Sequence, residues 1–196
     1  MNKYLSEFLG TFLMVLLGCG SIAIGWNSLM VSITFGFAVF MAIMIFQPHS
    51  GAHINPAVSI AFAAKGDLDA KLLPGYIIAQ CFGGFLAALI VMDGETRYSV
   101  SLSEAFLIEI SITLLLMYSI HILVNRKENL PTLALGVGSM VAILAYLFGE
   151  YTGAGMNPAR SLGPNIVTST SGLILYVIGP VIGAIISNFI ALRDDE

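Results

Sequence analysis

Charge is scarce in this chain. Only 10% of its 196 residues are charged, whereas 57% are hydrophobic and the mean hydropathy is +0.90. Soluble domains carry about 25% charged residues, so these proportions exclude an ordinary soluble domain and indicate a protein that crosses a membrane several times. No run of basic residues offers a surface for nucleic acid. The net charge of −4 says little about partners, because most charges should lie at the membrane surfaces.

Groups that could perform catalysis or bind a metal are also sparse. The two cysteines, Cys19 and Cys81, both fall in apolar stretches, where buried thiols are expected rather than a disulfide or a metal site. The sequence contains no recognisable nucleophile–base pair, metal-ligand cluster or nucleotide-binding loop. We therefore expect no enzyme activity, no metal site and no cofactor.

What is abundant is apolar sequence, in six segments that are each long enough to cross a bilayer. A crossing takes about 20 residues of helix, and the segments cover roughly residues 4–25, 28–47, 70–92, 102–124, 131–149 and 172–192. The first is too long for the apolar core of a cleavable signal and is interpreted as a span. Two shorter apolar stretches, roughly 54–64 and 156–168, cannot cross. We interpret them as half-helices that re-enter the bilayer.

Each short stretch begins with the tripeptide Asn-Pro-Ala, at residues 55–57 and 157–159. Asn is a favoured N-cap, and Pro at the first helical position gives up no N–H that the helix needs. Two helices therefore start part-way through the membrane. The residues before each Asn include Gly and cannot form regular helix. Such backbone is tolerated at membrane depth only where it is buried in protein or lines a water-filled cavity.

The two halves of the chain repeat each other. A shift of 102 positions aligns Glu7 with Glu109, and it also aligns Thr11 with Thr113, Gly36 with Gly138, Gly51 with Gly153 and Ser59 with Ser161. Each half reads as span, span, half-helix, span, over about 4–92 and about 102–192. Because three crossings is an odd number, the second half enters from the opposite face, which makes an inverted repeat. We predict an all-α membrane protein, a single channel domain over residues 1–196, whose half-helices meet near the midplane.

Asn55 and Asn157 would then face each other at this junction. Each helix start carries about half a positive charge, so the junction should repel cations and orient a water molecule with its oxygen toward the amides. The carbonyl groups of the preceding loops should form a ladder of acceptors, at Gly51, Ala52, His53, Ile54, Gly153, Gly155 and Met156. A solute leaving bulk water needs such partners, because an unmade buried hydrogen bond costs about 1–3 kcal/mol. This arrangement favours single-file passage of small neutral solutes.

Three of the charged residues within the apolar segments have candidate roles in the channel. Arg160 is on the first turn of the second half-helix, where a cation opposes the helix dipole, and this favours a pore-lining role in which it donates hydrogen bonds and excludes cations. Glu7 and Glu109 occupy matching positions, and we expect them to accept the N–H groups of the irregular loops. A proton-relay pair is the alternative for these carboxylates. The lack of repeat-related Lys or His partners argues against it.

These motifs together resemble the aquaporin, or major intrinsic protein, family. The segment SGAHINPAV (residues 50–58) is similar to that family's first signature, and GAGMNPARS (residues 153–161) is similar to its second. Glu7 and Glu109, each followed four positions later by Thr, match its repeat markers. The resemblance covers nearly the whole chain. It implies an hourglass fold, a pore in each protomer and a homotetramer.

The resemblance also implies a selectivity filter at four positions. By spacing from the signature asparagines these are Phe35, Ala145, Ala154 and Arg160. Strictly water-selective members tend to carry His at the position of Ala145, so this filter should be wider. Bacterial glycerol facilitators usually carry Asp after the Arg, where this chain has Ser161. The second signature is more similar to the nodulin-type and vacuolar subgroups, some of which pass glycerol, ammonia, urea or undissociated metalloid acids.

We therefore expect a passive channel for water and small uncharged solutes that excludes protons and ions. The alternatives are a strictly water-selective channel, a coupled secondary transporter and a structural or adhesion protein with a closed pore. Basic residues in short loops mark the cytoplasmic side. Arg97 and Arg160 fall on one side, whereas the other side carries Lys3, Lys65, Lys71, Arg126, Lys127 and Arg193. This predicts a protein of a cell membrane with both termini in the cytoplasm. The short loops and termini favour a prokaryotic plasma membrane.

Overall fold

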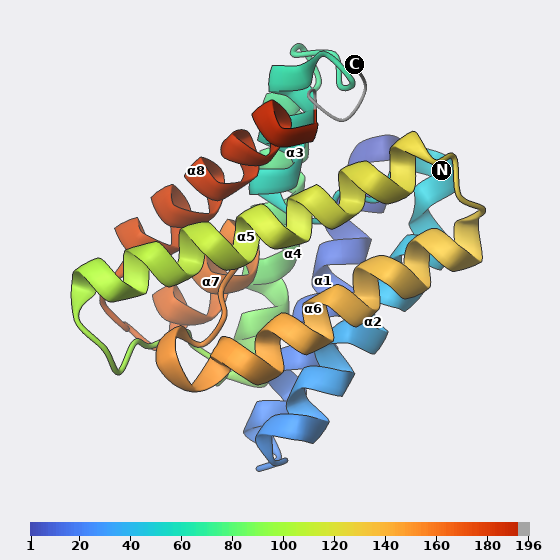
Figure 1. Ribbon diagram of the computed structural model, residues 1–196. Helices are drawn as coiled ribbons and strands as arrows, with labels where there is room; N and C mark the ends of the chain where they lie inside the picture. Colours follow the sequence, from blue (N-terminus) through green and yellow to red (C-terminus); the bar gives the residue numbers. More distant parts are fainter. Residues whose placement is uncertain (192–196) are drawn as a thin grey trace.

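The computed structural model describes residues 1–191, which form eight helices (Figure 1). Two have only ten residues, α3 (Pro56–Lys65) and α7 (Pro158–Val167). The other six are long and apolar enough to cross a membrane: α1 (Lys3–Ala23), α2 (Ser28–Ser50), α4 (Leu73–Val91), α5 (Leu102–Asn125), α6 (Leu130–Thr152) and α8 (Leu173–Ala191). The predicted fold class is thus confirmed. Arg193 and the ends of the last predicted span and of the predicted domain lie outside the described residues.

The helices α2 and α6 run three residues beyond the predicted ends of the second and fifth spans, and α2 includes Pro48. Glycine ends both of them. Gly51 and Gly153 adopt left-handed φ angles of +87° and +74°, and each donates its N–H to a carbonyl four residues back in the helix. Glycine reaches this conformation without the steric cost that a side chain would add. The irregular loops therefore begin at these two glycines.

The inverted repeat is evident in how the helices pack. In the first repeat α1 packs along α4, in the second repeat α5 packs along α8, and α2 packs along α6 across the two repeats (Figure 1). Glycines permit close approach between α2 and α6, because a Cβ added to Gly36 would lie 2.5 Å from the carbonyl oxygen of Gly138. Small residues give such contacts in membranes, where lipid supplies no hydrophobic drive for helices to associate.

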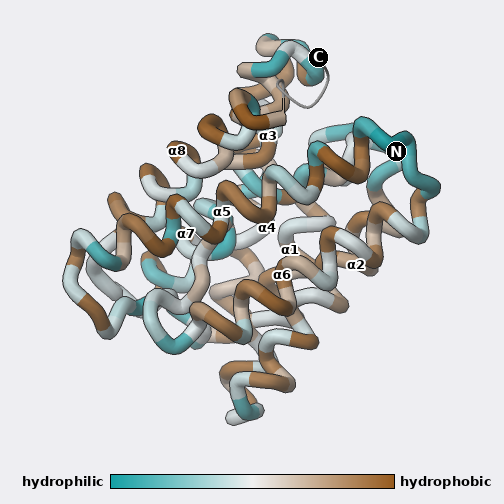
Figure 2. Tube along the Cα trace, in the orientation of Figure 1, coloured by the Kyte–Doolittle hydropathy of each residue, from teal (hydrophilic) through white to brown (hydrophobic). Residues whose placement is uncertain are grey.

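Hydrophobic residues cover the helix shafts, and hydrophilic residues gather near the N-terminus and at the turn between α5 and α6 (Figure 2). The outer faces carry large exposed apolar side chains, among them Ile78, Phe82, Leu107, Leu135 and Phe189. Exposed apolar area of this extent is rare on soluble monomers. Together with the six apolar helices it defines a multi-pass membrane protein.

Candidate functional site: a channel at the junction of the half-helices

The half-helices α3 and α7 begin next to each other inside the bundle. Asn55 and Asn157 cap them, each with its Oδ1 accepting an N–H two residues later, at 2.9 and 3.0 Å. The side-chain amides then cross between the repeats. Asn55 Nδ2 donates to the Met156 carbonyl at 2.9 Å, and Asn157 Nδ2 donates to the Ile54 carbonyl at 2.8 Å. The N-termini of the two half-helices are therefore joined by two hydrogen bonds, one from the side-chain amide of each N-cap.

The loops leading to these caps hold an unusual backbone. Ala52 and Ile54 have φ angles of +48° and +45°, and the equivalent Ala154 and Met156 have +43° and +48°. Left-handed backbone costs a residue with a side chain about 1–2 kcal/mol. Four such residues at matching positions persist only if their surroundings fix them. The carboxylates of the first and fourth spans do so.

Glu7 holds the first loop. Its Oε1 accepts the Ser50 hydroxyl at 2.7 Å and the His53 N–H at 2.9 Å, and its Oε2 accepts the Ile54 N–H at 2.6 Å and the Gln80 amide at 2.7 Å. The carboxylate is completely buried. Hydrogen bonds to an ionised acceptor are about twice as strong as neutral ones, so four donors converging on one carboxylate fix the strained turn.

Glu109 holds the second loop in the same way. Its Oε1 accepts the Thr152 hydroxyl at 2.7 Å and the Gly155 N–H at 2.8 Å, and its Oε2 accepts the Met156 N–H at 2.9 Å. It is also completely buried. The third spans of the two repeats align at a shift of 100 positions, which places Pro180 where the first repeat has Gln80. A proline side chain has no donor to offer. The two supports are therefore similar but not identical.

A pair of tyrosines, not predicted from the sequence, secures the last turns of the long helices that precede the loops. Tyr76 donates its hydroxyl to the Ser50 carbonyl at 2.7 Å, and Tyr176 donates to the Thr152 carbonyl at 2.8 Å. Tyr76 and Gln80 lie one turn apart on α4. Polar groups at helical spacing within an apolar span were the available sequence signal, because such groups need a partner inside the protein.

A cavity of about 1210 Å³ passes the junction, and its lining extends from Ser28, at the start of α2, to Lys65, at the end of α3. The structure brings the predicted pore residues together on this lining: both cap asparagines, all four filter positions and all seven ladder positions. Glu7 and Glu109 lie behind the loops. The rest of the wall is largely apolar and includes Met14, Val39, Ile43, Val58, Phe62, Leu116, Ile120, Val137 and Val141.

Three carbonyls of the ladder already have a partner within the protein. That of Gly155 accepts the Asn157 N–H at 2.5 Å. Those of Ile54 and Met156 accept the cross-repeat bonds from Asn157 and Asn55. A carbonyl oxygen has two lone pairs, so each can still accept one more bond from a solute. The amide of Asn157 also lies 3.8 Å from the Met14 sulfur, a weak acceptor that a solute oxygen readily replaces.

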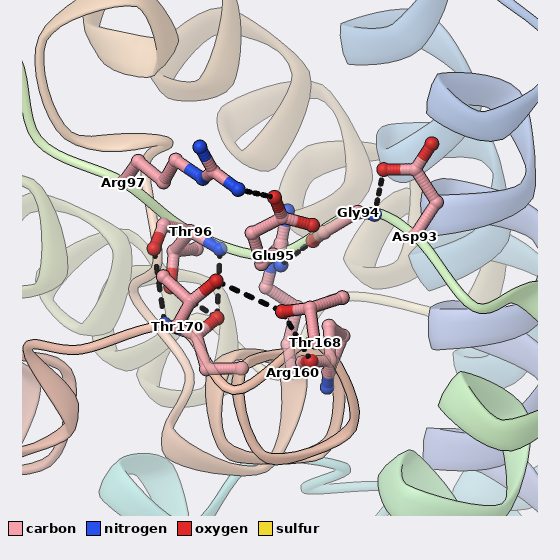
Figure 3. Close-up of polar contacts among 10 residues, drawn as sticks. Asp93, Gly94, Glu95, Thr96, Arg97, Arg160, Thr168 and Thr170 are labelled. Atoms are coloured by element: carbon pink, nitrogen blue, oxygen red, sulfur yellow. Dashed lines mark hydrogen bonds and ion pairs between the residues drawn. The ribbon is translucent and has the colours of Figure 1, made fainter.

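At one end of the cavity Arg160 faces Phe35. The guanidinium carbon lies 4.8 Å from the centre of the phenyl ring, and Nη1 donates to the Gly94 carbonyl at 2.8 Å (Figure 3). Arg160 is only 5% exposed, so its charge acts in a poorly hydrated place. Ala154 is buried and Ala145 half-buried on the same lining. The four predicted filter positions therefore carry two large groups and two methyl groups.

The loop between α4 and α5 passes beside Arg160 and is clasped to α7 (Figure 3). Thr96 donates its N–H and its hydroxyl to Asn165 Oδ1 at 2.8 and 3.1 Å, and Asn165 Nδ2 donates to the Thr96 carbonyl at 3.0 Å. Glu95 forms an ion pair with Arg97 on the same loop. The clasp keeps the Gly94 carbonyl beside the guanidinium. The sequence signal for it was the lone Asn inside an apolar half-helix.

Removing the clasp should loosen this end of the cavity. In an Asn165→Ala variant the buried polar groups of Thr96 lose their partner, so the free energy of unfolding should fall by about 1–3 kcal/mol. Thermal unfolding of the purified protein in detergent measures this change. The Asn165→Asp variant keeps the oxygen that accepts from Thr96 and loses the amide donor. Its unfolding temperature should therefore lie between those of the Asn165→Ala variant and the unaltered protein. An unfolding temperature of Asn165→Ala equal to that of the unaltered protein would contradict this role.

Six crossing helices and two half-helices joined at their starts, around a cavity that passes the joint, define a membrane channel. The chain belongs to the major intrinsic protein family, whose family model matches residues 1–191. It is accordingly a channel for water and small neutral solutes and not an enzyme, as predicted.

Relatives support this assignment. The chain is 34% identical to the glycerol uptake facilitator protein-like 6 of Lactiplantibacillus plantarum, over 97% of each chain. It is also 34% identical to aquaporin NIP1-2 of Arabidopsis thaliana, over 94% of this chain and 71% of that one, and 31% identical to nodulin-26 of Glycine max, over 94% and 74%. Among solved structures, the aquaglyceroporin of Plasmodium falciparum matches with a TM-score of 0.90 at 27% identity, covering 95% of this chain and 93% of that one.

Proposed function

We propose that solutes pass in single file through one pore in each chain, entering beside Phe35 and Arg160 and turning at Asn55 and Asn157. The observation that supports this most is the pair of cross-repeat bonds from the cap amides, at 2.9 and 2.8 Å. They join two helix starts, each with about half a positive charge, at one point of the cavity. The carbonyls of the loops supply acceptors, while much of the remaining lining of the cavity is apolar.

Exclusion of protons and other cations follows from the same charges. A water molecule at the junction turns its oxygen toward the two amides, so its hydrogens point outward in both directions. A chain of water molecules broken in this way does not relay a proton. Arg160 adds a full positive charge in a poorly hydrated part of the pore, where electrostatic repulsion is stronger than in bulk water. The first effect acts on protons and the second on all cations, and neither hinders neutral solutes.

The filter supports passage of solutes larger than water, such as glycerol. Ala145 and Ala154 contribute only methyl groups, so the width is set by Phe35 and Arg160. An aromatic ring facing a guanidinium suits a solute with a carbon backbone on one side and hydroxyl groups on the other. The names of the relatives agree, since they include a glycerol uptake facilitator and an aquaglyceroporin. Urea, ammonia and undissociated metalloid acids have comparable polarity and fall in the same proposed class.

Replacing Ala145 with His should narrow the filter and make the channel more selective for water. The imidazole ring projects into the space that a methyl group now leaves open, so glycerol flux should fall several-fold more than water flux. Stopped-flow light scattering on proteoliposomes measures both, with a sucrose gradient for water and a glycerol gradient for the solute. Ala145→Ser, which adds a single oxygen, should leave the flux ratio close to that of the unaltered protein. Exclusion of glycerol by the unaltered protein would contradict the filter assignment.

We further propose a homotetramer in a prokaryotic plasma membrane, with residues 1–196 as one channel domain and both termini in the cytoplasm. The exposed apolar residues on the outer helix faces support contacts with other subunits. The N-terminus and the turn between α5 and α6, which carries Arg126 and Lys127, lie at one end of the bundle (Figure 1). Native mass spectrometry should give four chains per particle, and protease added outside intact cells should leave an N-terminal tag uncut.

A further inference from the structure

Phe35 owes its position to a residue that does not touch the pore. Its ring lies against Gly18 of α1, where a glycine leaves room for it. A Cβ built on Gly18 would lie 2.2, 2.3 and 2.6 Å from three carbons of the ring, Cε1, Cδ1 and Cζ. Carbon atoms in contact prefer about 3.5–4.0 Å. The ring therefore occupies the volume that a side chain at Gly18 would need.

The ring also borders the cavity, which offers it space to move into. It is 6% exposed, and it lies on the cavity lining opposite the Arg160 guanidinium. The helix that carries it cannot retreat toward α6, because α2 and α6 are already in backbone contact at the next residue, Gly36, opposite Gly138. A ring displaced from Gly18 therefore moves into the channel and toward Arg160. The distance between these two groups sets the width of the filter.

The following residue of α1 supports the other large group. Gly94, whose carbonyl accepts the bond from Arg160, packs its Cα against Cys19, and a Cβ on Gly94 would lie 2.5 Å from the Cys19 Cβ. Gly94 has a left-handed φ of +86°, and the Cys19 sulfur lies 3.6 Å from its carbonyl oxygen. Adjacent residues of one helical turn therefore contact the ring on one side and the loop that holds the guanidinium on the other.

We propose that the turn of α1 at Gly18 and Cys19 sets the solute cut-off of the channel by positioning Phe35 and Arg160. Neither residue is among those that line the cavity, so both act through the filter and are positioning residues. This inference deepens the proposed function and rests on its filter assignment. It implies that the size of the residue at position 18 controls which neutral solutes pass, without any change in the pore lining itself.

The test is a Gly18→Ala variant, with Gly20→Ala as its matched control. Gly20 lies on the same helix, and a Cβ there would meet nothing within 4 Å. Gly18→Ala should lower the ratio of glycerol to water permeability by about fivefold or more, because one added methyl group in a filled site displaces its neighbour. Gly20→Ala should keep the original ratio. An unchanged ratio in Gly18→Ala protein that reconstitutes normally would overturn the proposal.

A double-variant cycle separates positioning from general damage. If Gly18 acts through the ring, adding Gly18→Ala to a Phe35→Leu background should change the permeability ratio little, because the smaller side chain leaves room for the methyl group. An equal drop in both backgrounds would overturn the proposal. If Gly18→Ala alone fails to fold, recovery of folded protein in the double variant supports the contact, and failure to recover counts against it. Liposomes with the unaltered protein that are no more permeable than bare lipid would refute the proposed function instead.

Discussion

Replacing Arg160 with alanine should make the channel leak cations. The side chain is 5% exposed and places a full positive charge beside the filter. At an effective dielectric constant of about 20, two unit charges 4 Å apart repel by about 4 kcal/mol, which corresponds to a factor of about 10³ in rate. The charges at the helix starts remain in the variant, so we expect an increase of about tenfold or more in proton or potassium flux. Dye-loaded proteoliposomes under an imposed ion gradient report both fluxes.

Arg97 provides the matched control for this experiment. Its side chain is 71% exposed and pairs with Glu95 on the loop beside the filter, so its charge is screened by solvent and by its partner (Figure 3). Arg97→Ala should leave cation flux at the level of the unaltered protein. Glycerol flux should rise in Arg160→Ala, because the filter loses one of its two large groups. If a folded Arg160→Ala variant passed no more protons or potassium ions than the unaltered protein, Arg160 would not be the barrier to cations.

Replacing Glu109 with leucine should cost more stability than any other single change considered. The carboxylate is completely buried and accepts bonds from the Thr152 hydroxyl and from the N–H groups of Gly155 and Met156. Three donors would lose their acceptor at about 1–3 kcal/mol each, so the free energy of unfolding should fall by at least about 3 kcal/mol. The strained backbone at Ala154 and Met156 would then lose what holds it. Yield and unfolding temperature in detergent measure the effect.

Glu104, on the same helix, is the control for this change. It is exposed and belongs to a capping box with Ser101, a role that glutamine also fills. Glu104→Gln should therefore leave the unfolding temperature nearly unchanged. Glu109→Gln keeps one carbonyl oxygen but turns an amide donor toward other donors, and its stability should lie between those of the leucine variant and the unaltered protein. A Glu109→Leu protein as stable as the Glu104→Gln protein would show that the carboxylate does not support the loop.

The sequence predicted the fold well because several independent signals agreed. Span length, the odd number of crossings in each repeat and the cap chemistry of Asn55 and Asn157 all required two helices that start inside the membrane. The ends of α2 and α6 were less predictable. Pro48 is normally a helix terminator, yet α2 continues past it, and Gly51 ends the helix because it can adopt the left-handed conformation.

The site was predictable where chemistry follows from residue type, and less so where it depends on packing. A carboxylate inside a span must find donors, so Glu7 and Glu109 could be assigned to the loops before any geometry was known. The clasp between Thr96 and Asn165 joins residues 69 positions apart, and no periodicity or spacing in the chain pairs them. The contact between the Phe35 ring and Gly18 could not be predicted from the sequence either, because the only trace that such an interhelical contact leaves there is a small residue.

The most direct test of the whole account is a paired flux measurement on one batch of proteoliposomes that contain a pH-sensitive dye. Water flux is followed by light scattering after an osmotic step, and proton flux by the dye after a pH step. If the joined starts of α3 and α7 form a conduit for neutral molecules, osmotic shrinkage should be several-fold faster than in empty liposomes while proton entry stays the same. Equal osmotic rates, or proton entry that rises in step with water flux, would contradict it.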